Sequence, residues 1–164
     1  MGVPNEQPPR ELAREPVDSD VDLHLGRQPR HRRDELAVLL VVSAGGAAGA
    51  GVRYLLGLAF PQPAGSFPWT TFAINVAGSA LIGVLMVLVT GVWTQRRLIR
   101  PFLGTGVLGG FTTFSTFAVD IQTLTGAGHA GSALLYLAAT PILAVLAVWA
   151  TASTTRRLIT WRTR

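Results

Sequence analysis

Cysteine and lysine are both absent from this chain of 164 residues. The absence of cysteine excludes disulfides, thiolate metal sites and cysteine nucleophiles. Charge is also scarce between the two ends of the chain. Residues 36–95 contain Arg53 as their only formally charged side chain, and residues 101–155 contain only Asp120. The charged residues therefore gather at the termini and in one middle segment.

The two charge-poor tracts have the composition of membrane-spanning segments. A transmembrane helix needs about 20 apolar residues, so each tract is long enough for two. Prolines mark the turn inside the first tract, and glycines mark the turn inside the second. We therefore expect an all-α membrane protein with four transmembrane helices, placed at Leu36–Leu58, Thr70–Trp93, Pro101–Thr125 and Gly131–Ser153.

The ends of the chain differ in composition from these tracts. Residues 1–34 are rich in Pro, Arg, Asp and Glu, and such a segment is expected to stay disordered. It lacks the charged, apolar and small-residue regions of a signal peptide. We divide the chain into this extension, a membrane domain over residues 35–155 and a basic tail over residues 156–164.

The arginines predict the orientation. Thirteen of the 14 basic residues flank the apolar tracts, and with four helices all of the flanking segments lie on one side. The positive-inside rule puts that side, with both termini, in the cytoplasm. We expect a multi-pass protein of the plasma membrane. The sequence pI of about 11.2 is explained by this placement, so no nucleic-acid partner is expected.

One segment of the third predicted helix is unusual for a membrane span. Residues 109–117 read Gly-Gly-Phe-Thr-Thr-Phe-Ser-Thr-Phe, with two glycines followed by four hydroxyls and three phenyl rings. Adjacent glycines weaken a helix by roughly 1 kcal/mol each relative to alanine, so the pattern predicts a broken helix. Freed backbone groups at membrane depth must face protein, water or an ion, which indicates an ion site or a permeation path.

Other polar residues in the spans allow two interpretations. Arg53 either snorkels to the outer surface or draws anions into a vestibule. Asn75 either bonds across helices or lines a pore. Tyr136 and Thr140, four residues apart, share one face; the tyrosine alone would also suit the aromatic belt.

The third span offers an anion-binding arrangement. Phe114 and Phe117 share a face, and phenyl edges carry partial positive charge. Thr116 and Ser115 supply hydroxyl donors beside them. Asp120 follows one turn later and lies either near the outer headgroups or at a water-filled mouth.

Three ordered motifs together resemble the fluoride channel family, known as Fluc or CrcB proteins. They are Gly-Gly-x-x-Gly-Ala-x-x-Arg-Tyr over residues 45–54, Asn75 followed by Gly78, and Gly-Gly-x-Thr-Thr-Phe-Ser-Thr-Phe over residues 109–117. The third motif is highly specific. The similarity covers residues 36–153.

The resemblance implies an antiparallel dimer with two fluoride pores. It also implies a structural sodium ion, held by backbone carbonyls of the broken third helix of both subunits, here those of Gly109 and Thr112. Hard cations prefer oxygen ligands. The resemblance assigns the remaining roles by position: Arg53 to the vestibule, and to the pore Asn75, Phe114, Phe117, Tyr136 and Thr140.

The arginine bias sets this chain apart from dual-topology members of the family. Subunits that all insert one way cannot form an antiparallel dimer. We therefore expect a heterodimer with an oppositely oriented homologue, and keep a homodimer as the alternative.

The expected function is passive export of fluoride, which reduces its toxicity, without enzyme activity. The alternative is a proton-coupled multidrug exporter, which needs a titratable carboxylate in its path; only Asp120 could serve. A triad of Ser115, His129 and Asp120 lacks a supporting motif, and a purely structural protein would not need the glycine break.

Overall fold

The computed structural model describes residues 32–63, 65–91, 93 and 97–162. The predicted extension over residues 1–34 therefore lies outside the described residues, apart from its last three positions. The same holds for Arg96 and for the last two residues of the predicted basic tail.

The described chain forms a bundle of helices with four apolar segments long enough to cross a membrane, as predicted. Two of these are single helices near the amino-terminal side, α1 (Arg32–Ala59) and α2 (Trp69–Gly91). The third segment consists of η1 (Arg100–Leu108), α3 (Gly109–Phe111) and α4 (Ser115–Gly126). The fourth is α5 (Ala130–Arg162).

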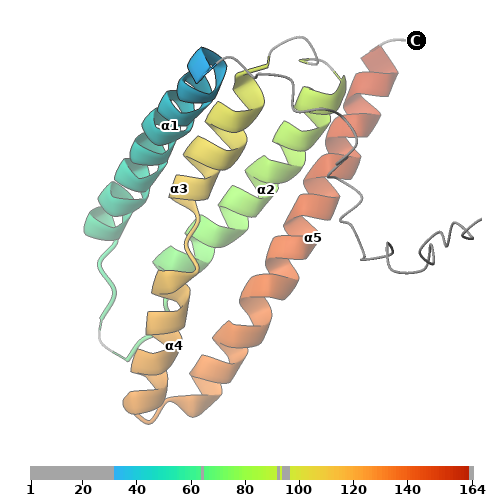
Figure 1. Cartoon of the computed structure of the whole chain (residues 1–164). Coiled ribbons are helices and arrows are strands. Elements are labelled where there is room, and N and C mark those ends of the chain that lie inside the picture. Colours follow the sequence, from blue (N-terminus) through green and yellow to red (C-terminus); the bar gives the residue numbers. More distant parts are fainter. Residues whose placement is uncertain (1–31, 64, 92, 94–96, 163–164) are drawn as a thin grey trace, which may run out of the picture.

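The segments run up and down, so that the start of α1 and the end of α5 lie at the same end of the bundle (Figure 1). The two connections at the opposite end approach each other. Gly65, in the α1–α2 loop, has a positive φ of 77°, and a Cβ there would lie 3.1 Å from the His129 ring in the α4–α5 turn. That turn is made by Gly128, whose φ is 80°, so the turn predicted at residues 126–129 is confirmed.

The predicted helix ends agree with the structure within about one helical turn, except at the end of α5. This helix continues past Ser153 to Arg162. No glycine or proline follows Pro141 in the sequence, and the Thr155 hydroxyl donates to the Thr151 carbonyl of the preceding turn. At 1.5 Å per residue the 33 residues measure about 50 Å, which exceeds the ~30 Å hydrocarbon core.

The segment η1 is wound as a π-helix, which the sequence did not predict. The Gly109 N–H at its end donates to the Gly104 carbonyl, five residues back. This wider winding is rare and occurs mostly at functional sites. The segment packs along α1, and their backbones are in close contact, because a Cβ on Gly45 would lie 2.6 Å from the Phe102 carbonyl oxygen.

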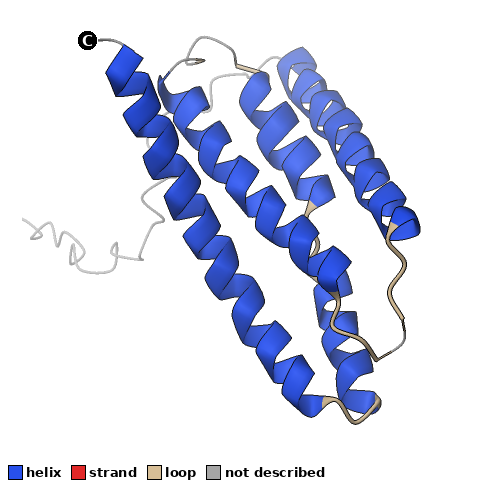
Figure 2. Ribbon diagram, turned by 180° about the vertical axis from the view of Figure 1, so that it is seen from behind, coloured by secondary structure: helices blue, strands red, loops and turns tan. Residues whose placement is uncertain are grey.

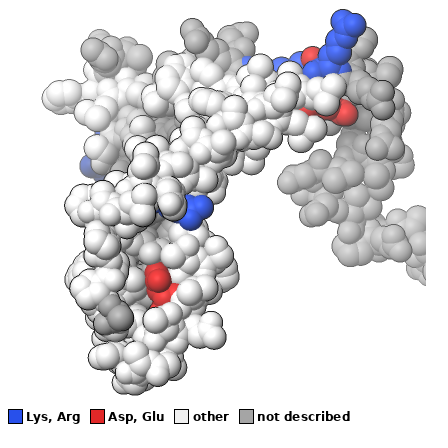
Figure 3. Space-filling model, turned by 90° about the vertical axis from the view of Figure 1, so that its left-hand side faces the viewer, with Lys and Arg blue, Asp and Glu red and all other residues white. Residues whose placement is uncertain are grey.

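The other half of the bundle is formed by α2 and α5, which lie side by side along their lengths (Figure 2). The Thr151 hydroxyl of α5 donates to the Ala80 carbonyl of α2 at 2.8 Å. Large apolar side chains on the outside of the bundle are exposed, including Leu40, Val145 and Trp149. The face in Figure 3 is largely uncharged, as suits a lipid environment. Most of its charge lies at the upper end, and one basic and one acidic group are visible lower, in the body of the bundle.

Candidate functional site

The backbone leaves the helical conformation between α3 and α4, midway along the third segment. Helix α3 ends at Phe111, and Thr112 is extended, with φ −77° and ψ 159°. Helix α4 begins at Ser115. In Figure 1 the ribbon uncoils between the two labels. We call residues 112–114 the interruption.

Two carbonyls at the interruption lose the donors that a continuous helix would give them. In an α-helix the N–H of residue i+4 donates to the carbonyl of residue i. The Thr113 N–H, the helical partner of Gly109, donates instead to Asn75 Oδ1 at 2.8 Å. The Thr116 N–H, the helical partner of Thr112, donates to Thr113 Oγ1 at 3.2 Å. The Gly109 and Thr112 oxygens are therefore released from helical pairing.

Asn75 bonds to both backbone groups of one residue. Besides accepting from the Thr113 N–H, its Nδ2 donates to the Thr113 carbonyl at 2.9 Å. The side chain is buried, so this pairing replaces the helical bonds of Thr113 away from water. Gly78, one turn along α2, allows this approach, because a Cβ there would overlap the Thr112 methyl group. The interhelical interpretation of Asn75 thus has direct support, and the amide keeps a second hydrogen.

Arg53 reaches the other side of the interruption. Its Nε–H donates to the Gly110 carbonyl at 3.1 Å. The side chain is half-buried and lines a cavity of about 320 Å³ between α1, α2 and α4. Thr71, Thr113 and Thr116 line the same cavity. The guanidinium therefore contacts protein and does not extend only toward the surface.

A second cavity, of about 310 Å³, lies on the opposite side of the interruption, against α5. Phe114 and Phe117 line it, with ring centroids 5.9 Å apart. Their exposure differs greatly: 80% of Phe114 is exposed but only 8% of Phe117. The other lining residues combine one amide and several hydroxyls with apolar groups: Asn75, Ser79, Ile82, Thr112, Thr113, Thr140, Pro141 and Ala144.

Tyr136 is fully buried between aromatic rings. Its ring lies 5.0 Å from that of Phe117 and 5.3 Å, edge to face, from that of Phe67. The hydroxyl donates to Asp120 Oδ2 at 3.3 Å. The contact between Tyr136 and Phe67 was not predicted from the sequence, because Phe67 lies in a proline-rich loop far away along the chain and no periodic pattern relates that loop to α5.

Hydroxyls at the interruption bond mainly to protein. Thr113 Oγ1 donates to Thr116 Oγ1 at 3.1 Å and lies 3.3 Å from the Ser115 hydroxyl, which is exposed. The Thr140 hydroxyl donates to the Tyr136 carbonyl at 2.8 Å. Within the described ranges, no buried side-chain nitrogen or oxygen lacks a partner. Thr113 was not predicted as a site residue, although it lies in the quoted motif and joins Asn75 to Thr116.

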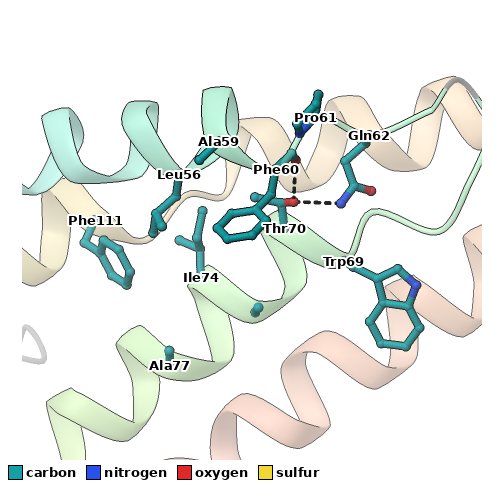
Figure 4. Close-up of a pocket in the computed structure, with 11 residues that line it drawn as sticks. Leu56, Ala59, Phe60, Pro61, Gln62, Trp69, Thr70, Ile74, Ala77 and Phe111 are labelled. Carbon is teal, nitrogen blue, oxygen red and sulfur yellow. Dashed lines mark hydrogen bonds between the residues drawn. The ribbon is translucent and has the colours of Figure 1, made fainter.

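A larger cavity, of about 660 Å³, lies elsewhere, between the end of α1 and the start of α2. Figure 4 shows that Leu56, Ile74 and Phe111 give it apolar walls. Its polar rim is closed, because Gln62 donates to the Thr70 hydroxyl at 2.8 Å and that hydroxyl donates to the Phe60 carbonyl at 2.9 Å. It offers little chemistry for an anion.

Comparison with known proteins identifies the family. The model of the CrcB-like proteins, described also as camphor resistance (CrcB), matches residues 40–152. The chain belongs to this family. CrcB proteins are fluoride ion channels and not enzymes, so the expectation of a protein without enzyme activity is confirmed, as is the resemblance.

Three individual relatives are named as fluoride-specific ion channels. The fluoride-specific ion channel FluC 1 of Streptomyces coelicolor is 54% identical over 130 residues, which cover 79% of this chain and 84% of the relative. FluC 2 of Streptomyces avermitilis is 57% identical over 118 residues, 70% and 75% of the two chains. FluC 3 of the same organism is 52% identical over 92 residues, 56% and 45% of the two chains.

Proposed function

We propose that this chain is a subunit of a fluoride-selective channel through which fluoride leaves the cytoplasm passively, which reduces its toxicity. The proposal rests on two observations taken together. Relatives of this chain are named as fluoride-specific channels, and the interruption is bordered by hydroxyls, an amide and two phenyl rings. The four spans predicted from the sequence contain one arginine and one aspartate as charged residues, and a passive channel requires no coupling group.

The two cavities at the interruption form successive parts of the proposed path. Fluoride is small and strongly hydrated, so a selective pore must replace its water with fixed donors. Arg53 draws the anion into the first cavity, where Thr116 lies. In the second, the remaining Nδ2 hydrogen of Asn75 and the edges of Phe114 and Phe117 face the ion. Ser115, Tyr136 and Thr140 are the further hydroxyls of the proposed path. To donate to the ion, the Tyr136 hydroxyl must turn away from Asp120 and the Thr140 hydroxyl from the Tyr136 carbonyl.

The released carbonyls of Gly109 and Thr112 suit a resident sodium ion. Their helical donors are diverted to Asn75 and to the Thr113 hydroxyl, and carbonyl oxygens match the preference of a hard cation. The described residues contain no group of three or more His, Cys, Asp or Glu that suggests another kind of metal site. When bound, the ion would be coordinated by carbonyl oxygens that have lost their helical hydrogen-bond donors.

A second subunit completes the proposed site. Phe114, which lines the second cavity, is 80% exposed in the single chain, and an antiparallel partner would cover it. The arginine bias predicts cytoplasmic termini and a single orientation in the plasma membrane. The partner is therefore an oppositely oriented homologue. FluC 2 and FluC 3 of Streptomyces avermitilis, both similar to this chain, are two homologues in one organism, which is what a heterodimer needs. A homodimer is the alternative.

Fluoride efflux from liposomes tests the proposal. The purified chain is reconstituted alone and together with a homologue of opposite arginine bias, with chloride efflux as the control for leakage. If only the mixed preparation releases fluoride but not chloride, both the channel function and the heterodimer are supported. Selective efflux from the chain alone supports the channel and overturns the heterodimer. No fluoride efflux in either preparation overturns the proposed function.

A further inference from the structure

Arg53 replaces a backbone hydrogen-bond donor that the Gly110 carbonyl loses at the interruption. In a continuous helix the Gly110 carbonyl would accept from the N–H of Phe114, but α3 ends at Phe111 and α4 begins at Ser115. The Arg53 Nε–H takes that place at 3.1 Å. A side chain of α1 thus holds the backbone of α3, 57 residues further along the chain.

The two partners are held at a fixed separation by the packing of α1 on α3. A Cβ on Gly110 would overlap the Gly46 carbonyl, and one on Gly49 would overlap the Val107 carbonyl. The backbone of α1 is therefore in direct contact with those of η1 and α3 over about one turn of α1. Helical side chains lean toward the amino terminus of their helix, so Arg53, one turn beyond Gly49, reaches back to Gly110.

The backbone at this point needs an external restraint. Gly109 and Gly110 are adjacent, and glycine has the greatest φ/ψ freedom of any residue. Gly109 has also lost its helical donor, because the Thr113 N–H bonds to Asn75. The direction of the Gly109 carbonyl is then determined by whatever holds the next peptide unit, and Arg53 holds that unit.

We propose that Arg53 is a positioning residue for the cation site: its Nε–H fixes the Gly110 carbonyl and thereby aims the neighbouring Gly109 carbonyl at the ion. This inference rests on the sodium site of the proposed function. It separates two properties of one side chain. The Nε–H governs the affinity for sodium, and the positive charge, on the wall of the cavity with Thr116, governs the capture of fluoride.

Three substitutions separate the donor from the charge. Gln places its Nε2 as many bonds from Cα as Arg places its Nε, so Arg53→Gln keeps a donor for Gly110 without the charge. Lys has a methylene group at that position, so Arg53→Lys keeps the charge but has no donor where the Arg53 Nε–H lies; its ammonium is one bond further out. Arg53→Met removes both. The exposed Tyr54 offers a neighbouring control, Tyr54→Phe.

The experiment measures the unfolding temperature of each variant in detergent against Na⁺ concentration, with N-methyl-D-glucamine keeping the ionic strength constant. The dimer composition is the one active in the liposome assay. We expect wild type, Tyr54→Phe and Arg53→Gln to respond to Na⁺ at the same half-saturating concentration. Arg53→Lys and Arg53→Met need about two- to tenfold more Na⁺, the change expected for one lost hydrogen bond.

Fluoride efflux at saturating Na⁺ is expected to sort the variants differently, with Arg53→Lys close to wild type and Arg53→Gln and Arg53→Met slower. A sodium response that is lost in Arg53→Gln but kept in Arg53→Lys would overturn the positioning role. If Arg53→Lys does not fold, the half-saturating Na⁺ concentration of Arg53→Gln decides: a value equal to wild type supports the positioning role, and a higher value overturns it. A wild type that unfolds independently of Na⁺ would overturn this inference, whereas its fluoride efflux would leave the proposed channel standing.

Discussion

The two halves of the third membrane segment pack in different ways. The half nearer the predicted cytoplasmic end, η1 with α3, is called the inner half; it lies against α1 and touches its backbone through glycines. The other half, α4, is called the outer half; it lies against α5 and packs through side chains, with Phe117 and Asp120 in contact with Tyr136. Among the described residues α4 has no close backbone contact with α1, and the inner half has none with α5.

This comparison explains why the helix stops where it does. The segment changes its partner helix at the interruption, and the backbone groups released there must be paired within the membrane. Asn75 and Arg53, from two other helices, provide that pairing. The inner half thus packs through its backbone and the outer half through side chains. The proposed fluoride and sodium sites lie at the boundary between the two halves.

The boundary is predicted to be the most sensitive point. Asn75→Leu leaves the N–H and the carbonyl of Thr113 without partners, and each unsatisfied buried group costs about 1–3 kcal/mol, which gives a loss of about 2–6 kcal/mol. The free energy of unfolding is measured by SDS titration in mixed micelles. Thr90→Val on the same helix, whose hydroxyl bonds only to its own helix, is the control. Equal stability of the two variants would show that the Asn75 bonds are dispensable.

The inner half is predicted to reject even one methyl group. In Gly49→Ala the new Cβ meets the Val107 carbonyl oxygen, and such overpacking costs about 1–3 kcal/mol. Gly51→Ala, on the same helix, has nothing within 4 Å of its Cβ and is expected to gain up to ~1 kcal/mol from helix propensity. The same titration compares them. A loss of stability in both variants would contradict backbone contact as the cause.

The outer half is predicted to tolerate loss of a single polar contact. Tyr136→Phe keeps the ring between Phe117 and Phe67 and removes the hydroxyl that bonds to Asp120. We expect a loss of about 0.5–1.5 kcal/mol in the free energy of unfolding. Tyr54→Phe, which changes an exposed hydroxyl, serves as the reference. A cost above that of Asn75→Leu would reverse the ranking of boundary and outer half.

The smallest effect is expected for Asp120→Asn. The amide oxygen still accepts from Tyr136, so the change in the free energy of unfolding is expected to be below about 1 kcal/mol. Fluoride efflux should continue and should not respond to an imposed proton gradient. Asp34→Asn, in the exposed pair with Arg97, is the matched control. Abolished transport in Asp120→Asn alone would favour the proton-coupled exporter over the channel.

Much of the architecture was predictable from local composition. The four spans, the last turn and the family follow from hydropathy, glycine and the motif at residues 109–117, and these are confirmed. The end of α5 was predicted wrongly, because a helix ends at a stop signal and not at the edge of the apolar run. The π-helical winding of η1 carries no sequence signal that we can name.

The contacts at the site were less predictable. The sequence identified Asn75 and Arg53 as unusual residues of the spans but left their interpretation open. The structure gives Asn75 the two backbone groups of Thr113, and gives Arg53 the Gly110 carbonyl. It also surrounds Tyr136 with Phe67, Phe117 and Asp120. These partners lie in other segments of the chain, about which periodicity gives no information.

The sequence by itself determined the number of spans and the segment where polar groups gather, because hydropathy and glycine content act over neighbouring residues. Only the tertiary structure decided which side chains pair the backbone at residues 109–113. A freed N–H or carbonyl in a membrane must find a partner within hydrogen-bonding distance, and the packing of α1 and α2 against the third segment determines which one is near.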